Sequence, residues 1–375
     1  MKIKTIETKI ISIPLDKLKY SSTRPIITRE YLITKVTTDD EIVGWGITFG
    51  GRDTKLIVEN ELKPLLLKEN PAYVESLWNK MFNKTLRWGR RGIYIRAIST
   101  IDIALWDIKC KAYQVPLYKM LGGYRRSVPA YASGGYYKIE KPEKGFDEVE
   151  AISEEMQKNV DEGFFAAKMK VGGRSISLDI DRIRAAREIL GKDRKLYIDV
   201  NNGWKLYQLT SKIIDELEEI GVDWIEEPFM PDAINETLML KEKTRIPIAT
   251  GEIHSTRWDF KQLLESKAVD IWQPDATVLG GITEYNKVIN MASIWDIPVA
   301  PHVMHEIHIH LAAACPESQG FILEYFDTTG DTINYGKLLK KPLKAKNGYL
   351  ITPDEPGVGM DFDDELIEKY ELKDY

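Results

Sequence analysis

The sequence predicts an α/β protein: a modified (β/α)8 barrel of the TIM type with an α+β capping unit formed by the N-terminal region and the C-terminal tail. Short apolar runs alternate eight times with helical segments in the middle of the chain, which is the pattern of such a barrel. Gly163, Gly191 and Gly221 follow three of these segments, where a C′ glycine belongs. The residues before this region instead place strands first and helices after them.

The N-terminal unit is expected to open with strands at 1–13, 30–36 and 42–48, because apolar and polar residues alternate there. Helical patterns follow at 55–67, 73–82 and 93–112, and Leu121-Gly122-Gly123 ends the last of them. We predict that the capping unit spans 1–125, that the barrel spans 126–330, and that the segment 331–375 packs back on the capping unit.

The barrel strands are predicted from the eight apolar runs, at 128–133, 166–171, 196–201, 222–227, 246–252, 269–275, 297–302 and 321–325. Helices are predicted between them, at 146–162, 178–190, 206–220, 258–266 and 282–294. A doubly wound open sheet is the alternative, but no G-x-G-x-x-G phosphate turn follows the first run. The tail is expected to contain a strand at 348–351 and a helix at 364–370.

The composition excludes several classes of protein. Of 375 residues, 43% are hydrophobic and 29% are charged, which allows a large core and rules out a disordered chain. The net charge of −6 argues against a nucleic-acid binder. Two cysteines cannot form a disulfide framework, so a cytoplasmic protein is expected. The N-terminus predicts a strand rather than a signal peptide, and no apolar run is long enough to span a membrane.

Charged or titratable residues close seven consecutive apolar runs. In chain order they are Lys168 with Lys170, Asp199 with Asn201, Glu226 with Glu227, Glu252, Asp275, His302 and Glu324. Barrel enzymes place their reactive groups at the carboxyl ends of the strands, so these side chains should converge on one mouth. Lys168 and Lys170 are two residues apart and should face the same side.

Three carboxylates from neighbouring strands, Asp199, Glu226 and Glu252, indicate a metal site. Bare anions crowded into one pocket would raise one another's pKa, and a hard divalent cation removes that cost. Ligation by oxygen alone, with open positions, suits Mg²⁺. Glu227 is the alternative ligand to Glu226, and Asp199 by itself could be a turn residue before Asn201-Asn202-Gly203.

The remaining strand ends carry acid–base groups. Like charge should lower the pKa of adjacent lysines, which would suit one of them to act as a base near neutral pH. His302 lies on the opposite strand and could reach the other face of a substrate, while Asp275 could hold its imidazole in one tautomer. Glu324, at the end of the eighth run, would complete the ring of charged and titratable groups around the barrel mouth.

These elements, in this order, resemble the mandelate racemase branch of the enolase superfamily. The resemblance runs nearly end to end and also rests on Ile101-Asp102-Ile103-Ala104-Leu105-Trp106-Asp107, Leu121-Gly122-Gly123 and Pro356-Gly357-Val358-Gly359. It implies one Mg²⁺ per subunit on the three carboxylates, with Lys170 and the His302–Asp275 pair as acid–base catalysts on opposite faces. It also implies that Lys168 tunes Lys170 and that Glu324 hydrogen-bonds the substrate carboxylate.

The same resemblance implies that two capping loops close the mouth and choose the substrate. Here they correspond to 15–25 and 49–54, and their polar, cationic side chains favour a polyhydroxylated acid over an aromatic one. The candidates for substrate binding are Arg24, Arg52, Ser133, Tyr136 and Asn201. The preferred function is dehydration of an aldonic or aldaric acid through an enediolate to a 2-keto-3-deoxy acid.

Two other functions stay open. A racemase or epimerase of a 2-hydroxy acid would use the same Lys and His pair, and a non-catalytic metabolite-binding protein would share only the fold. The segment His305-Glu306-Ile307-His308 is not H-E-x-x-H, so a zinc site formed by His305, His308 and His310 is disfavoured. These three histidines are expected on the helix that follows the seventh barrel strand and on the residues that lead into it. His254 is expected either to touch substrate or to lie at the surface. The partners implied are a small sugar acid and further copies of the chain, with no nucleic acid and no membrane.

Overall fold

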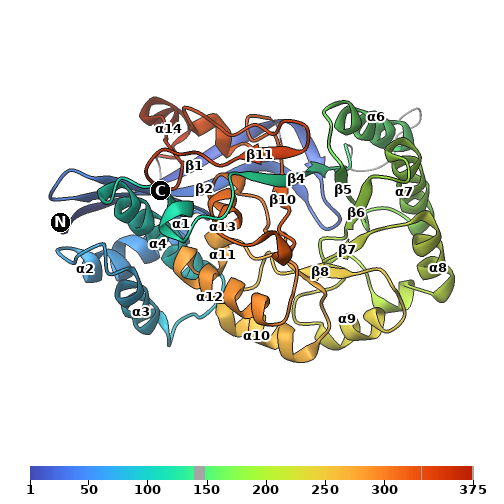
Figure 1. Cartoon of the computed structure of the whole chain (residues 1–375), viewed down its shortest axis with the longest axis horizontal. Helices are drawn as coiled ribbons and strands as arrows, with labels where there is room; N and C mark the ends of the chain where they lie inside the picture. The colour runs from blue at the N-terminus through green and yellow to red at the C-terminus, as the bar shows by residue number, and fades with distance from the viewer. Residues whose placement is uncertain (139–147, 331, 374–375) are drawn as a thin grey trace.

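The computed structural model describes residues 1–138, 148–330 and 332–373. It places a curled parallel sheet with outer helices beside a smaller antiparallel sheet that is covered by helices (Figure 1). The predicted fold class is therefore confirmed. The small sheet has the order β1-β2-β3 and consists of β1 (Ile3–Tyr20), β2 (Pro25–Thr38) and β3 (Val43–Phe49).

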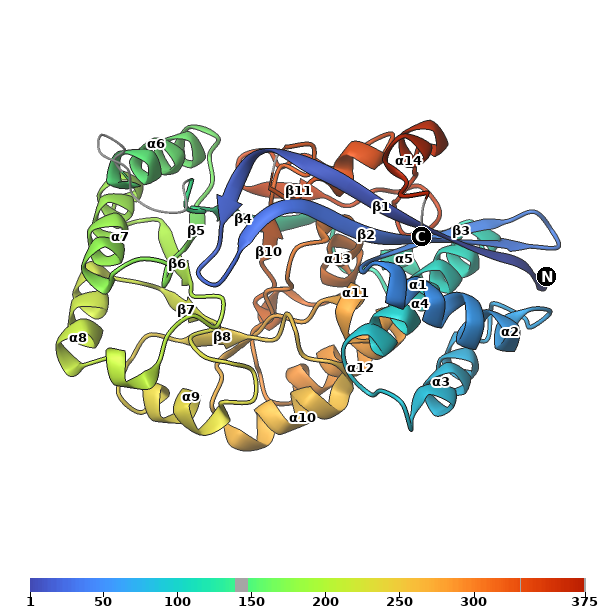
Figure 2. The same cartoon turned by 180° about the vertical axis from the view of Figure 1, so that it is seen from behind.

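Strands β1 and β2 form a long hairpin that runs across to the barrel, as Figure 2 shows from behind. The prediction ended the first strand at residue 13, but the strand continues to Tyr20. The arm beyond Pro14 carries both apolar and polar residues on each face and therefore shows no alternation, yet its backbone still pairs with β2 after a register shift. At the tip, the backbone N–H of Tyr20 donates to the Tyr137 carbonyl (2.9 Å), and the Ser22 hydroxyl donates to the carbonyl of Val171.

Six helices follow in the capping region. They are α1 (Arg52–Ile57), the π-helix η1 (Val58–Leu62), α2 (Lys63–Leu66), α3 (Val74–Thr85), α4 (Ile93–Ala112) and α5 (Leu117–Met120). Helix α4 packs directly on β3 because two glycines of the strand leave room for it. A Cβ atom at Gly46 would lie 1.8 Å from the Thr100 carbonyl oxygen, and one at Gly44 would lie 2.2 Å from that of Ala104.

Substitution of Gly46 by alanine is expected to lower the free energy of unfolding by about 3 kcal/mol, because the added methyl forces α4 away from β3. Urea denaturation followed by circular dichroism measures this change. Gly51→Ala is the matched control, since a Cβ there meets only the flexible end of Glu30. Equal midpoints for the two variants would refute the role assigned to the close approach.

The parallel sheet has the strand order β10-β4-β5-β6-β7-β8-β9, and β11 adds to β4 as an antiparallel neighbour. The strands are β4 (Ser127–Gly134), β5 (Ala166–Lys170), β6 (Lys195–Asp199), β7 (Trp224–Glu226), β8 (Ile248–Thr250), β9 (Ile271–Trp272), β10 (Leu323–Tyr325) and β11 (Tyr349–Ile351). Seven of the eight predicted barrel runs therefore contain a strand.

The seventh run, 297–302, was wrongly predicted as a full strand. Within the described residues it makes only an isolated parallel bridge between Trp272 and Val299. Pro298 and Pro301 have no N–H group, so this stretch cannot donate a regular ladder of hydrogen bonds. In the part of the chain that the structure describes, the segment that carries His302 therefore forms a bridge with β9 but no regular strand pairing with β10, and the sheet is open between this segment and β10.

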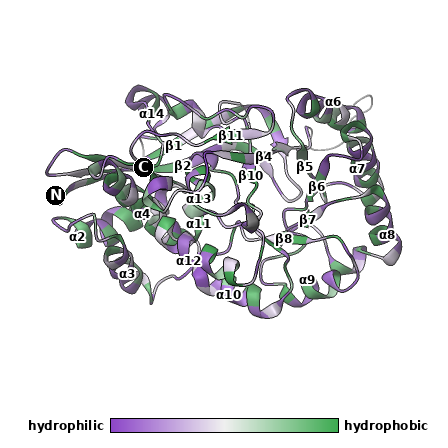
Figure 3. Cartoon of the chain, viewed as in Figure 1, coloured by the Kyte–Doolittle hydropathy of each residue, from purple (hydrophilic) through white to green (hydrophobic). Residues whose placement is uncertain are grey.

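Outer helices alternate with the strands. They are α6 (Glu148–Asp161), α7 (Ile176–Leu190), α8 (Ser211–Ile220), α9 (Ile234–Lys241), α10 (Thr256–Ser266), α11 (Ala276–Leu279), α12 (Gly281–Ile294) and α13 (His305–Ala313), with short 3₁₀ turns η2 (Leu206–Gln208) and η3 (Glu317–Gln319). Figure 3 shows polar and apolar residues on both α7 and α8, as expected for helices with one face on the sheet. Side chains of Ser175 and Thr210 cap these two helices, and Gly221 ends α8 in the left-handed conformation.

The C-terminal residues form η4 (Tyr335–Leu338) and α14 (Asp364–Tyr370) and return to the N-terminal sheet. Glu371 forms a backbone bridge with Ile11 and an ion pair of 2.9 Å with Lys9. Gly357 forms a second bridge with Pro116. None of the helices in the described ranges combines the length and the apolar character needed to cross a bilayer.

Candidate active site

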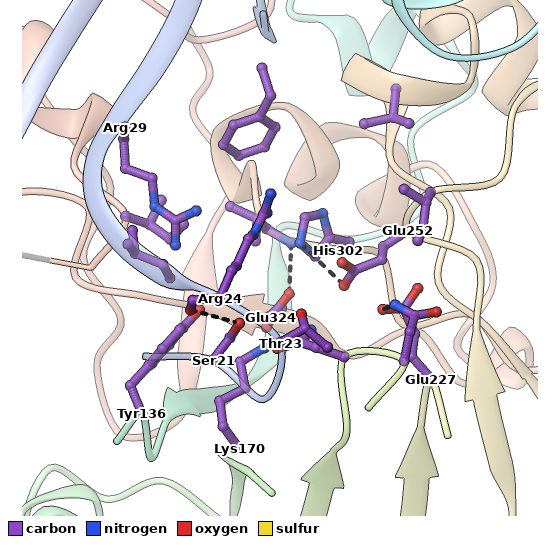
Figure 4. A pocket seen from close by; sticks show the side chains of 18 of the residues that line it. Ser21, Thr23, Arg24, Arg29, Tyr136, Lys170, Glu227, Glu252, His302 and Glu324 are labelled. Carbon is purple, nitrogen blue, oxygen red and sulfur yellow. Dashed lines mark hydrogen bonds and ion pairs between the residues drawn. The ribbon is translucent and has the colours of Figure 1, made fainter. Parts of the chain in front are cut away.

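The carboxyl ends of the barrel strands surround a cavity of about 560 Å³ beneath the β1–β2 hairpin tip. Figure 4 shows Lys170 and His302 on different sides of it, with Arg24 reaching in from the tip. Charged and polar residues on its wall include Ser21, Thr23, Arg24, Arg29, Arg96, Tyr136, Lys170, Asn201, Glu227, Glu252, His302 and Glu324. The apolar remainder includes Phe49 and Phe326.

The three predicted metal ligands lie together. Asp199 and Glu226 end β6 and β7 and are fully buried, and Glu252 follows β8; one oxygen from each lies within 4.8 Å of the others. Glu227 is outside this cluster: the left-handed backbone at this residue turns its side chain toward Asn202, whose amide donates to it at 2.9 Å.

The donor set fits a hard divalent cation. All three ligand groups are carboxylates, and burial together with the neighbouring Asp199 raises the pKa of Glu226 to about 8. Crowded, buried carboxylates of this kind are stabilised by a cation that takes oxygen ligands. The turn signal after β6 is also real, since Asn201 and Asn202 have positive φ and the Asn201 N–H donates to Asp199 at 2.9 Å. Asp199 thus shapes the turn with Oδ1, while its Oδ2 is paired with Lys168 and Lys170.

Two buried lysines of β5 contact these carboxylates. Lys168 Nζ lies 2.5 Å from Glu226 and 2.7 Å from Glu324, while Lys170 is paired with Asp199. Burial alone would lower the pKa of each lysine, but the carboxylates outweigh burial and raise both values above the ordinary one. The expectation of lowered lysine pKa values was therefore wrong for this arrangement, because it counted the neighbouring lysine and not the acids opposite.

His302 and Asp275 form the predicted pair. Nδ1 of His302 lies 2.9 Å from Asp275 Oδ2, and Nε2 lies 3.4 Å from Glu252. Burial lowers the pKa of His302, but Glu252, Asp275 and Glu324 outweigh it and raise the pKa to about 9. Asp275 is held in turn by Thr277, whose N–H and hydroxyl both donate to its other oxygen at 2.7 Å.

Glu324, at the end of β10, connects the two sides of the site. Its Oε1 accepts from the Ser133 hydroxyl at 2.6 Å and from Lys168, and its Oε2 accepts from the Val303 N–H at 2.8 Å. Burial raises the pKa of Glu324, but Lys168, His302 and Lys170 together outweigh burial and lower it to about 2. Glu324 is therefore held as an anion beside the residue that follows His302.

The five candidates for substrate binding separate into two groups. Arg24, Tyr136 and Asn201 line the cavity. Ser133 instead bonds Glu324 and lies outside the lining, and Arg52 is exposed on α1 and does not reach the cavity. Arg52 was placed at the mouth because the loop was expected to extend to residue 54, whereas α1 already begins at Arg52.

Sequence reasoning missed three polar residues at the site. Arg96 of α4 lines the cavity and donates to the Phe49 carbonyl at 3.2 Å, and Arg29 of β2 lines it and donates to Thr332. Gln273 donates to Glu226 Oε2 at 2.6 Å from the residue after β9. Only Gln273 carried a usable signal, because it is a polar residue at the end of an apolar run.

The other histidines do not form a metal site with acidic or cysteine side chains in the described part of the chain, where the carboxylate cluster is the only such group. His305, His308 and His310 are buried on α13, as the helix prediction implied. His254 is buried against Phe260 rather than at the surface, and it does not line the cavity.

Family models match both parts of the chain. Residues 6–122 match the mandelate racemase / muconate lactonizing enzyme N-terminal domain, and residues 151–366 match the enolase C-terminal domain-like family. The chain is 37% identical to the arabinonate dehydratase of Saccharolobus solfataricus over 92% of this chain and 91% of that enzyme. It is 32% identical to the D-galactarolactone cycloisomerase of Agrobacterium fabrum over the full length of both.

Solved structures agree with this result. A racemase from Streptomyces coelicolor with bound magnesium superposes with a TM-score of 0.90 and 28% identity, covering 99% of this chain and 100% of that one. A mutant L-talarate/galactarate dehydratase liganded with Mg and L-glucarate gives a TM-score of 0.87 and 27% identity, covering 99% of this chain and 92% of that one.

Proposed function

Because the chain belongs to the mandelate racemase/muconate lactonizing enzyme family of the enolase superfamily, we propose that it is a Mg²⁺-dependent sugar-acid dehydratase. The observation that carries the proposal is the placement of Lys170 and the His302–Asp275 pair on different sides of one cavity, next to a cluster of three carboxylates. The substrate is an aldonic or aldaric acid, and the product is a 2-keto-3-deoxy acid.

Asp199, Glu226 and Glu252 would hold the Mg²⁺. When bound there, the cation supplies electrostatic stabilisation of the negative charge that develops on the substrate carboxylate as the α-proton leaves. Lys168 adds a fixed positive charge beside Glu226 and Glu324, because it is buried among acids and keeps its proton. Two carboxylate anions cannot hydrogen-bond each other, so Glu324 would have to take up a proton before it donates a hydrogen bond to the substrate carboxylate.

The charge of Asp199, which raises the pKa of Lys170, would be offset by a cation held there, and this would allow Lys170 to lose its proton. Neutral Lys170 then removes the α-proton as the general base, and this step leaves an enediolate. His302 acts from the other side as the general acid. Asp275 accepts a hydrogen bond from Nδ1, so Nε2 of the imidazole is the nitrogen left for the cavity. Proton transfer from Nε2 to the β-hydroxyl lets that group leave as water, and the resulting enol becomes the 2-keto-3-deoxy acid.

A racemase or epimerase of a 2-hydroxy acid is the second candidate. It is favoured by the same observation, since Lys170 and His302 both line the cavity and could exchange a proton on opposite faces of the α-carbon. Such an enzyme would return the proton instead of expelling water.

A panel of aldonic and aldaric acids incubated with the protein and Mg²⁺ tests the proposal. We expect a 2-keto-3-deoxy product from at least one acid, detected as its semicarbazone, and loss of turnover when EDTA removes the cation. A racemase would exchange the α-hydrogen with heavy water and give no keto product. If neither dehydration nor exchange occurs with any acid, the protein is not an enzyme of this type.

We propose that the capping region, built from residues 1–125 and 331–375, selects the substrate, and that Arg24 contributes directly. Substitution of Arg24 by glutamine is expected to lower kcat/KM by about 10- to 100-fold, because a charged hydrogen bond to the substrate is lost. A larger loss with an aldaric acid than with the matching aldonic acid would place Arg24 on the second carboxylate.

Arg52→Gln is the matched control for Arg24→Gln, since Arg52 belongs to the same capping region but does not line the cavity. Its kcat/KM should stay within about twofold of the wild-type value. Equal losses in the two variants would contradict the assignment and indicate a long-range effect of charge.

We also propose that the chain works as a cytoplasmic homo-oligomer of two or more copies. Cys110 and Cys315 are free, which is consistent with a reducing compartment. Size-exclusion chromatography with light scattering tests the assembly, and a mass of 43.0 kDa in solution would refute it.

A further inference from the structure

We propose that His308 is a positioning residue that holds the His302–Asp275 pair in place by bonding the backbone beside each of its members. His308 lies on α13, is fully buried and does not line the cavity. It therefore touches no substrate, and its effect on the reaction passes through the two residues that it positions. The proposal rests on the proposed function, which assigns His302 the role of general acid.

Two hydrogen bonds carry the inference. The backbone N–H of Ala276 donates to His308 Nε2 at 3.0 Å, and Nδ1 of His308 lies 2.7 Å from the carbonyl oxygen of Val303. Ala276 is the residue after Asp275, and Val303 is the residue after His302. One imidazole ring thus bridges the two backbone segments that present the acid–base pair.

The partners also fix the tautomer of the ring. A backbone N–H can only donate, so Nε2 of His308 must be the unprotonated acceptor. A carbonyl can only accept, so the proton must lie on Nδ1 and point to Val303. His308 is a neutral imidazole in a single tautomer, and it cannot become an imidazolium without breaking the bond from Ala276. Burial lowers its pKa, which agrees with this arrangement.

The segment after His302 needs such support. Val303 and Met304 both have left-handed backbones, with φ of 46° and 39°. Two consecutive residues in this region are unfavourable, above all when one is β-branched, so the surroundings must hold them. Glu324 accepts from the Val303 N–H, and His308 donates to its carbonyl. The regular ladder of a seventh strand does not supply this support, because only the bridge at Val299 pairs with β9.

The second segment is held less rigidly without His308. Asp275 is fixed by its bonds from Thr277, but these lie within the same short turn that leads into α11. The bond from Ala276 to His308 links that turn to α13. Loss of the imidazole would therefore let the two segments move relative to each other and misalign Nε2 of His302 with the leaving group.

The variant His308→Phe tests the proposal with a ring of similar shape that still packs on Tyr285 but makes neither hydrogen bond. We expect kcat for dehydration to fall by about 100-fold with KM nearly unchanged, because a small misplacement of a catalytic group acts on the transition state. His310→Phe is the matched control. His310 is equally buried on the same helix, but its Nδ1 accepts from Tyr118 and not from either segment of the pair.

The His310 variant should lose thermal stability while its kcat stays within about twofold of wild type. If both variants lose kcat equally, or if His308→Phe lowers only the melting temperature, His308 is an ordinary core residue and the proposal is wrong. The comparison of the two variants matters because a smaller active fraction lowers the apparent kcat and leaves KM unchanged. Only a loss of kcat that is confined to His308→Phe therefore identifies a positioning role.

A second measurement needs no variant to fold. Nuclear magnetic resonance of the wild-type protein labelled with ¹⁵N-histidine should show one neutral ring with its proton on Nδ1 and no titration between roughly pH 5.5 and 8.5. A proton on Nε2 of every neutral ring, or titration of all rings in that range, would overturn the proposal. Failure of the wild type to dehydrate any sugar acid would instead refute the proposed function, and the tautomer measurement would still decide whether His308 bridges the two segments.

Discussion

Replacing Lys170 with methionine is expected to lower kcat for sugar-acid dehydration by about 10³-fold or more, the largest effect of any single substitution outside the metal cluster. Methionine keeps most of the length of the side chain at the end of β5 but removes the only group there that can take the α-proton. Lys168 cannot replace it, because its Nζ is buried between Glu226 and Glu324 and does not line the cavity. The measurement is the steady-state rate of keto-acid formation.

The control for this prediction is Lys195→Met, at the start of β6. Lys195 is exposed, pairs with Asp223 and lies at the opposite end of the strand from Asp199. Its variant should keep kcat within about twofold of wild type. If Lys170→Met retains a tenth or more of the activity, Lys170 is not the base, and exchange of the α-hydrogen in heavy water should then be lost in His302→Asn instead.

Substitution of Glu226 by glutamine should weaken Mg²⁺ binding by about 100-fold and reduce kcat/KM by about 10³-fold. One charged ligand is removed, and the amide nitrogen that replaces one carboxylate oxygen is not a ligand for a hard cation. Lys168 would also lose its 2.5 Å partner, so part of the loss reflects that lysine. Isothermal titration with Mg²⁺ separates the binding effect from the rate effect.

Glu227→Gln is the paired control, since it changes the neighbouring residue in the same way. Glu227 lies outside the cluster of three carboxylates, so its variant should bind Mg²⁺ within about threefold of wild type. The opposite result, weak binding in Glu227→Gln and normal binding in Glu226→Gln, would exchange the roles of the two residues.

The sequence predicted the floor of the site well because a parallel barrel converts regular spacing into proximity. Asp199, Glu226 and Glu252 lie roughly one βα unit apart, and any barrel register that buries the apolar runs brings them to the same mouth. The same logic placed His302 beside Asp275, although the segment of His302 is not a full strand. The site side chains come together because their segments follow one another around the barrel, and this does not require every segment to form a full set of strand hydrogen bonds.

Features of the capping region could not be derived in this way. Its side chains reach the cavity from a hairpin, a strand and a helix whose packing on the barrel has no repeat in the sequence. Arg96 is one residue of a long helix that is buried from residue 97 to residue 108, so nothing in its local pattern marks it as part of the site. The prediction of lowered pKa values for the two lysines was wrong for a similar reason. These pKa values depend on which acidic side chains lie opposite the lysines in the fold and not on the neighbours of the lysines in the sequence.

The hairpin tip fastens to the barrel through Tyr20 and Ser22, whereas the side chains of Thr23 and Arg24 make no hydrogen bond or ion pair within the described residues. Anchorage and recognition are thus divided between adjacent positions of one loop. Selection can replace the recognising pair without loosening the anchoring pair, so a library randomised at these two positions should yield mostly folded proteins that differ in the acids they accept.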